Sequence, residues 1–538
     1  MKLFPHTFLK NPRTIKKIFV FLTLLCGSVY FAPTTDFAGL LAQGDHGRDF
    51  YAFERTLKGD VPFRDYWWVY GPLMPYYYSL FFKWLGVSIP SILIGRIILT
   101  LFSGVLIFLS LAEVTSVLRA FLAALCFYMF FPDFYFTYNH TGAITAMTAL
   151  FYGVTCYLNR RQDRYLVMAL GAVSVTGLIK INFGLASLVF LVLAVAWIDR
   201  VDQRPWNANK KIFYIAAVAG VPLFIGGVYS LFLRGLPVYV IKQSLPFWGQ
   251  HLYNIPLTKA VGNLCLFLWM NYTDGLLGML STAWFLTLTA VAIYWVVFNK
   301  AVLPEHRAVM FLAGLTAIFA VLNLHEYLPN GIMYRLFWML PWGMVLIFLL
   351  WHLGEMGMPS WTKPVGYLLI FGIIIVGYRN HERELQIYKQ PEHFVSHPKA
   401  RVYVQNTPAW IETVLQTSRF LEKVPEKTFF AAPYEPLYYY LTSRKSPVQL
   451  LSYFEYIYIP EEQEREVISE LEKQNVRWVL LSNRIVGNEA GLGLFGSTHC
   501  RLLASYIQEH FKVVATSGNW AHPAGWAWQH AIMILKRP

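Results

Sequence analysis

Long apolar segments with few internal charges recur along the first two thirds of the chain. A helix needs about 20 mostly apolar residues to cross a bilayer, or slightly fewer when the span is short. By this measure the predicted spans lie at residues 18–33, 90–112, 117–131, 141–158, 165–179, 182–198, 212–232, 276–298, 308–323, 338–353 and 365–378. The pattern therefore predicts an α-helical polytopic membrane bundle with about 11 transmembrane helices.

The pattern becomes that of a water-exposed domain near residue 378. Residues 461–475 predict a helix with Val467, Ile468 and Leu471 on one face, and residues 476–481 predict a buried strand. Further helices and strands are predicted at 409–423, 428–432, 500–511, 512–516 and 531–536. We therefore expect two domains: a transmembrane bundle at 1–378 with a large first external loop at 34–89, and an extracytoplasmic α/β domain at 379–538.

Composition supports the membrane assignment. Of the 538 residues, 56% are hydrophobic and only 14% are charged, whereas soluble domains have about 25% charged residues. These values exclude a soluble, a disordered and a collagen-like chain. The formal net charge of +14 is compatible with binding to nucleic acid or to a membrane surface, or with basic cytoplasmic loops that hold the orientation of the chain.

The positions of the basic residues favour cytoplasmic loops over nucleic acid. If the N-terminus is cytoplasmic, three short loops on the cytoplasmic side contain Arg160, Arg161, Arg164, Arg200, Arg204, Lys210, Lys211, Lys300 and Arg307. The basic start and the first apolar run resemble a signal peptide, but the lack of a convincing small-residue cleavage site before Pro33 favours a retained span. We expect a multi-pass protein of the cell inner (plasma) membrane, with its C-terminal domain outside.

The first external loop combines acidic and aromatic residues. Six acids lie within it, namely Asp36, Asp45, Asp49, Glu54, Asp60 and Asp65, and they alternate with Phe50, Tyr51, Phe53, Phe63, Tyr66, Trp67, Trp68 and Tyr70. A solvated loop with ordinary surface acids is one interpretation. An amphipathic helix on the membrane interface, with its rings in the headgroup layer, explains the rings at least as well and would hold a carboxylate at membrane level.

This loop resembles that of a known superfamily. The order DHGRD, ERTLKG and VPFRDYWWVYGPL is similar to the first loop of GT-C superfamily membrane glycosyltransferases, in the bacterial branch related to protein mannosyltransferases and lipid A aminoarabinose transferases. The corresponding positions are Asp45, Gly59, the run 62–65 and the turn 71–73. The resemblance implies a GT-C-like bundle that transfers a sugar from a polyprenyl-phosphate donor.

The resemblance also implies which carboxylate is catalytic. The loop aspartate of the family is taken as the general base, which here corresponds to Asp45, and Asp49 is the alternative one helical turn later. A sugar on a polyprenyl phosphate already has a good leaving group, so the main need is a carboxylate that accepts the proton of the acceptor hydroxyl. A nearby arginine such as Arg48 would lower the pKa of that base.

Three basic residues are candidates for binding the donor phosphate. Lys180, between Gly177 and Gly184, resembles a family turn with a lysine, although a lysine reaching towards the membrane surface explains it equally well. Arg335 lies in a Tyr-Arg-Leu stretch like one in related transferases, and Arg64 belongs to the first-loop motif. Arginine binds phosphate in a forked geometry.

Five further residues are expected to line the cavity: Asp65, Tyr66, His140, His325 and Glu326. One histidine beside one acid at 325–326 is too small a set to predict a metal site, and the five cysteines form no CxxC pair. No cofactor is therefore assigned, although a divalent cation on the donor phosphate would be compatible with this chemistry.

The sequence thus favours an inverting glycosyltransferase that moves a sugar from a polyprenyl-phosphate donor to a lipid, glycan or protein acceptor on the external membrane face. The alternatives are a transporter or flippase and a polymerase or ligase of lipid-linked glycans. A transporter would be expected to have charges inside its spans and related halves, whereas here most charges cluster in external loops and no half-repeat is visible. A polymerase or ligase usually has its large loop later in the chain. The expected partners are the donor lipid, the acceptor and the membrane, without nucleic acid.

Overall fold

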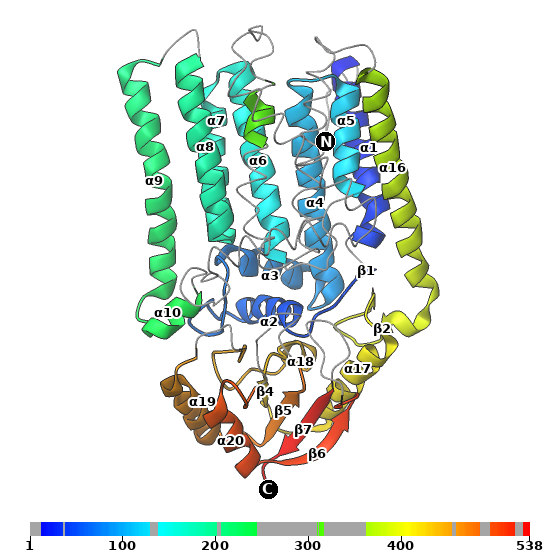
Figure 1. Cartoon of the computed structure of the whole chain (residues 1–538), viewed down its shortest axis with the longest axis vertical. Coiled ribbons are helices and arrows are strands. Elements are labelled where there is room, and N and C mark those ends of the chain that lie inside the picture. Colours follow the sequence, from blue (N-terminus) through cyan, green and yellow to red (C-terminus); the bar gives the residue numbers. More distant parts are fainter. Residues whose placement is uncertain are drawn as a thin grey trace, which may run out of the picture.

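The computed structural model describes residues 12–35, 38–129, 138–201, 206–244, 309, 311–316, 362–454, 459–484, 495–521 and 531–538. These residues form three layers (Figure 1). Long helices run side by side in the first layer, and two shorter helices lie across their ends in the second. The strands and helices of the C-terminal region form the third.

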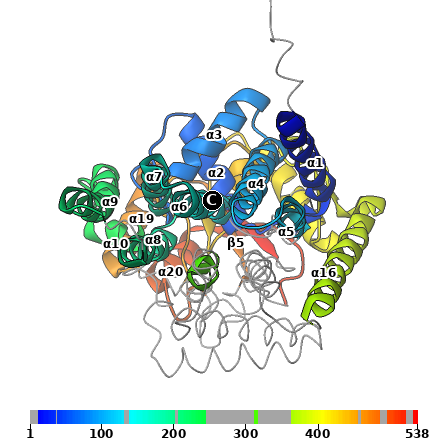
Figure 2. The same ribbon diagram turned by 90° about the horizontal axis from the view of Figure 1, so that it is seen from above.

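The long helices match the apolar segments closely. They are α1 (Pro12–Thr35), α4 (Ile89–Ala112), α5 (Val117–Met129), α6 (Tyr138–Arg160), α7 (Asp163–Ile179), α8 (Ile181–Val201), α9 (Ala208–Leu233) and α16 (Thr362–Glu384). Within the described residues, four of them (α4, α6, α8 and α9) are long and apolar enough to cross a membrane. The chain is therefore an integral membrane protein. Seen from above, the helices form an arc with α9 and α16 at opposite ends (Figure 2).

The total of eleven spans stays a prediction. The expected spans at 276–298 and 338–353, and most of the one at 308–323, lie outside the described residues. The eight other predicted spans each coincide with one of the long helices.

Basic residues cluster at the helix ends that lie away from the second layer (Figure 1). Arg160, at the end of α6, pairs with Glu113 after α4. Lys210, at the start of α9, pairs with Asp163 at the start of α7, with 2.7 Å between Nζ and Oδ1. The charged turns are therefore at the opposite end of the bundle from the first loop.

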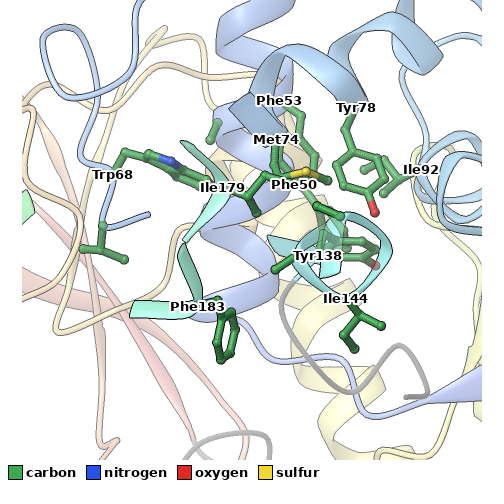
Figure 3. Close-up of a cluster of buried hydrophobic side chains, with 14 of the residues drawn as sticks. Phe50, Phe53, Trp68, Met74, Tyr78, Ile92, Tyr138, Ile144, Ile179 and Phe183 are labelled. Carbon is green, nitrogen blue, oxygen red and sulfur yellow. The ribbon is translucent and has the colours of Figure 1, made fainter. Parts of the chain in front are cut away.

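The second layer consists of α2 (Asp45–Leu57) and α3 (Leu73–Leu85), which come from the first loop. The prediction that the rings of the loop helix lie among headgroups is wrong, because Phe50, Phe53 and Trp68 are fully buried. The rings of Phe53 and Tyr78 stack at 4.8 Å, and the ring of Tyr138 on α6 lies 5.5 Å from that of Phe50 (Figure 3). Protein covers α2 on both sides, so its aromatic residues form a core.

The third layer contains two sheets. Its helices are α17 (Pro408–Lys423), α18 (Leu437–Leu441), α19 (Glu461–Lys473) and α20 (Arg501–His510), and its larger sheet has the order β4 (Phe430–Ala432), β5 (Trp478–Ser482), β7 (Ile532–Lys536) and β6 (Lys512–Ser517). Strands β4 and β5 are parallel, and the other neighbours are antiparallel. The described elements also include helix α10 (Val238–Ser244) and the 3-10 helices η5 (Leu385–Lys389) and η6 (Pro391–His393).

The smaller sheet joins distant parts of the chain. Its central strand β3 (Val402–Val404) pairs in parallel with β1 (Ala38–Gly39) and antiparallel with β2 (Phe394–Val395). The expected boundary between residues 378 and 379 falls inside α16, which is one continuous helix. Because β1 belongs to the first loop, that loop is built into the C-terminal region.

A glycine allows α2 to approach the third layer closely. A Cβ atom on Gly47 would lie 2.2 Å from the backbone nitrogen of Leu437 in α18. The backbone nitrogen of Leu437 also donates a hydrogen bond of 3.1 Å to the carbonyl of Gln43. Contact at this distance is possible only without a side chain at position 47.

We therefore expect Gly47→Ala to destabilise the protein, because a backbone segment rather than a flexible side chain must move. Overpacking of this kind costs roughly 1–3 kcal/mol. Thermal unfolding of the detergent-solubilised protein should show a lower midpoint. The matched control is Gly171→Ala in α7, where a Cβ atom meets nothing within 4 Å. An unchanged midpoint in Gly47→Ala would contradict the close packing of α2 on α18.

Candidate functional site

Two carboxylates at the start of α2 share one arginine. The Nη1 atom of Arg48 lies 3.2 Å from Oδ1 of Asp45, and its Nη2 atom lies 2.8 Å from Oδ1 of Asp49. The Nε atom of Arg48 donates a second hydrogen bond of 3.0 Å to the same oxygen of Asp49. The structure therefore brings both predicted bases together and places Arg48 between them.

The two aspartates differ in access. The side chain of Asp45 is 24% exposed, whereas that of Asp49 is fully buried. Oδ2 of Asp49 also accepts a hydrogen bond of 3.3 Å from the backbone nitrogen of Tyr138. Of the two carboxylates, Asp45 is the one that an outside molecule can reach.

Burial also changes how Asp49 ionises. Removal from water raises its pKa to about 6, and the charge and hydrogen bonds of Arg48 oppose this rise. Burial alone would lower the pKa of Arg48, but Tyr434 and Asp49 raise it well above its usual value. Arg48 therefore stays a cation, while Asp49 titrates nearer to neutrality than an ordinary aspartate.

Lys180 and Arg48 both lie near the ring of Tyr70. The Nζ atom of Lys180 is 5.6 Å from the ring centroid of Tyr70, and the guanidinium carbon of Arg48 is 4.8 Å from the same centroid. Lys180 is largely buried and its Nζ atom lies 2.8 Å from Nε2 of His140. Two cations thus face one tyrosine, an arrangement that favours both of them through cation–π attraction.

Glycine at position 71 explains how the first loop reaches Lys180. Its backbone nitrogen donates a hydrogen bond of 2.8 Å to the carbonyl of Ile179, and a Cβ atom there would lie 1.8 Å from the carbonyl oxygen of Leu178. The indole nitrogen of Trp68 donates to the carbonyl of Gly71 at 2.9 Å. The two motifs singled out in the sequence, at 71–73 and 177–184, therefore meet at this turn.

The start of α6 adds polar groups beside Lys180. His140 is buried, and its ring lies 6.3 Å from that of Tyr70. The amide of Asn139 is fully buried and has no hydrogen-bond partner among the described residues. Buried amides usually have hydrogen-bond partners, so this amide is a polar group available beside Lys180.

Three other predicted site residues, Arg64, Asp65 and Tyr66, form contacts within the first loop. Arg64 is exposed and forms an ion pair of 2.8 Å with Asp65, and the pKa of Asp65 is lowered by that hydrogen bond. Oδ2 of Asp65 also accepts a hydrogen bond of 2.8 Å from the backbone nitrogen of Val61. Tyr66 is buried, with 2.7 Å between its hydroxyl and that of Thr56. These contacts hold the loop at 61–66 and do not include Asp45, Arg48 or Asp49.

The remaining candidates, Arg335, His325 and Glu326, lie outside the described residues. Within the described part of the chain, no group of three or more His, Cys, Asp and Glu side chains could hold a metal ion. Arg48 lies where a cation between Asp45 and Asp49 would bind. The described carboxylates therefore do not fit a divalent cation at this position.

The third layer contributes two residues that the sequence alone did not point to. The hydroxyl of Tyr434 lies 2.9 Å from Oδ1 of Asp45, and the Nη1 atom of Arg484 donates a hydrogen bond of 3.1 Å to the carbonyl of Tyr434. Both residues follow the ends of parallel neighbouring strands, β4 and β5. Such strand ends are a common place for binding sites, and this was the signal available in the sequence.

Comparisons with known proteins give likenesses in structure only. No protein-family model and no curated protein matches the sequence. The chain is similar to ArnT from Cupriavidus metallidurans bound to undecaprenyl phosphate, with a TM-score of 0.49, 11% identity, and coverage of 96% of this chain and 98% of that one. It is also similar to the Archaeoglobus fulgidus oligosaccharyltransferase in complex with Zn and sulfate, with a TM-score of 0.48, 12% identity, and coverage of 86% and 68%. Both neighbours are GT-C superfamily membrane glycosyltransferases, the superfamily that the first loop resembles.

The raised pKa of Asp49 predicts a pH-dependent stability. An aspartate whose pKa is higher in the folded state binds more protons when folded, so stability falls as pH rises from about 4 to about 6 and is constant above. We expect the wild type to lose up to about 3 kcal/mol relative to Asp49→Asn over this interval. Thermal unfolding of both proteins in detergent between pH 4 and pH 8 measures the difference.

Asp65→Asn is the control, because Asp65 changes stability with pH in the opposite direction from Asp49. Its hydrogen bond with Arg64 lowers the pKa of Asp65, so the stability that Asp65 contributes is lost as pH falls. The effect should be small because water screens this exposed pair. If the difference in thermal midpoint between the wild type and Asp49→Asn does not vary with pH, the buried environment of Asp49 is contradicted.

Proposed function

We propose that this protein is an inverting glycosyltransferase that uses a polyprenyl-phosphate sugar as donor and a hydroxyl of a lipid, glycan or protein as acceptor. The observation that carries the proposal is the carboxylate of Asp45, which is partly accessible at the edge of a buried, charged and aromatic cluster. A general base must come within hydrogen-bond reach of the proton that it removes. Partial exposure allows an acceptor hydroxyl to approach Asp45, whereas Asp49 is enclosed by protein.

The reaction requires one displacement at the anomeric carbon of the sugar. The acceptor oxygen forms a bond to this carbon while its proton passes to the carboxylate of Asp45. The bond between the anomeric carbon and the phosphate oxygen breaks, and the electron pair leaves with the polyprenyl phosphate. Attack from the face opposite the phosphate inverts the configuration.

Cations near the leaving group would stabilise its charge as this bond breaks. Lys180 is the described candidate, because it is buried beside Tyr70 together with Arg48. A fixed charge in a site that excludes water acts more strongly than the same charge in solution. Arg335 is proposed as a second contact to the phosphate, and the amide of Asn139 as a partner for a hydroxyl of the sugar or acceptor.

We further propose that the reaction takes place on the external face of the inner membrane, with the N-terminus cytoplasmic. The basic turns with Arg160 and Lys210 lie at the end of the bundle opposite α2. The positive-inside rule then supports an external position for α2 and for residues 379–538. This region is proposed to act as a domain that covers the site.

Asp45→Asn should abolish most of the activity, because the amide cannot accept the proton. Loss of a general base lowers turnover by roughly 100- to 10,000-fold. The assay is turnover of a panel of polyprenyl-phosphate sugars by the purified protein, with donor binding measured separately and expected to persist. The control is Asp163→Asn, which should leave turnover unchanged. Asp163 begins α7, at the end of this helix that lies away from Lys180. Full activity in Asp45→Asn would overturn the assignment.

Lys180→Gln should weaken binding of the donor by roughly 30-fold, about 2 kcal/mol, because a buried contact to the phosphate is lost. Binding of a polyprenyl phosphate is measured by the change in thermal midpoint as its concentration increases. Lys210→Gln is a matched control, since Lys210 also lies among aromatic rings but at the other end of the bundle. Equal affinity in the wild type and Lys180→Gln would exclude Lys180 from the phosphate site.

A further inference from the structure

The larger sheet delivers two residues to the start of α2. Ala432 of β4 pairs in parallel with Leu481 of β5, so the chain leaves both strands at the same edge. Tyr434 and Arg484 follow directly. A Cβ atom on Gly44, which precedes α2, would lie 2.4 Å from the ring of Tyr434 and 2.7 Å from Nη1 of Arg484. Both side chains therefore lie against the turn that begins the catalytic helix.

The hydrogen bonds of Tyr434 have only one consistent direction. The Nη1 atom of Arg48 lies 3.1 Å from the hydroxyl oxygen of Tyr434, and this hydroxyl lies 2.9 Å from Oδ1 of Asp45. A guanidinium can only donate, so the hydroxyl accepts from Arg48 and its single proton points to Asp45. Asp45 thus receives charge-assisted hydrogen bonds from both Arg48 and Tyr434.

Tyr434 is held rigidly in this orientation. It is buried, and Arg484 both donates to its carbonyl and lies 5.4 Å from its ring centroid. The ring of Trp67 from the first loop meets it edge to face at 5.9 Å, and the ring of Phe454 does so at 5.4 Å. Such packing on several sides leaves the hydroxyl little freedom to turn away from Asp45.

We propose that Tyr434 is a positioning residue that orients the carboxylate of Asp45 and stabilises its ionised form. This inference rests on the proposed role of Asp45 as the base. It makes the C-terminal region a part of the catalytic apparatus as well as a cover, because the residue that orients the base follows a strand of the sheet. Among the described residues, Arg48 and Asp49 on the same helix are charged groups near Asp45, and Arg484 lies beside Gly44, the residue before Asp45.

The test is Tyr434→Phe, which keeps the ring and removes the hydroxyl. Without this donor the carboxylate is harder to ionise, so the acid limb of the pH profile of kcat/KM should move about one unit higher. At the pH optimum kcat should fall roughly tenfold, whereas KM for the donor should stay unchanged. A merely structural role of Tyr434 would lower stability without moving the acid limb.

A second measurement does not depend on turnover. A water-soluble carbodiimide modifies protonated carboxyl groups, and peptide mass spectrometry measures the labelling of Asp45 as a function of pH. The midpoint of this labelling should move upward in Tyr434→Phe. A shifted labelling midpoint in a protein that turns over no polyprenyl-phosphate sugar would refute the proposed function and support the role of Tyr434. An unshifted midpoint would overturn the role of Tyr434 whatever the activity.

Two variants complete the design. Tyr453→Phe removes another buried tyrosine hydroxyl of the third layer, which donates at 3.2 Å to the carbonyl of Leu450. It should leave both pH midpoints unchanged, and a shift equal to that of Tyr434→Phe would refute the specific role. Arg484→Met removes the anchor of Tyr434 and should move both midpoints in the same direction by a smaller amount. No movement in Arg484→Met would show that this anchor does not hold the hydroxyl.

Discussion

The burial of α2 between two protein layers is the constraint on which the site depends. A helix that begins with Asp45, Arg48 and Asp49 would ordinarily lie in water, because a charge without partners in a protein interior costs several kcal/mol. Here Arg48 bridges both carboxylates, and Glu54 pairs with Lys399 at 2.8 Å. The pairing of charges makes burial possible, and burial in turn fixes the geometry of the carboxylates.

The same constraint separates the two acids by environment. They lie one helical turn apart and share an arginine, yet Asp49 faces the interior and Asp45 faces the edge. The interior position raises the pKa of Asp49, while partial exposure leaves Asp45 open to a substrate. Asp49 therefore orients Arg48, and Arg48 with Tyr434 orients Asp45.

Much of the architecture was predictable from the sequence. The helices α1, α4 and α6 correspond to apolar runs of membrane length, and the strands β5 and β7 correspond to short apolar runs. The role of Asp45 as general base and that of Lys180 as a phosphate contact stay predictions, made from the resemblance of the first loop at 45–73 and the turn at 177–184. Local pattern and residue type are sufficient for such conclusions because they depend on neighbours in the chain.

Contacts between distant segments were decided by the tertiary structure alone. The sequence placed the rings of the first loop in the headgroup layer, because nothing in a local pattern indicates that α18 covers the far side of α2. The ion pair of Arg64 with Asp65 within the loop is another contact that only the structure shows. Tyr434 reaches Asp45 across 389 positions of the chain. The aromatic and acidic residues of the first loop were thus determined by the sequence, whereas their burial, their pairing and their partner from the sheet depended on how the three layers pack.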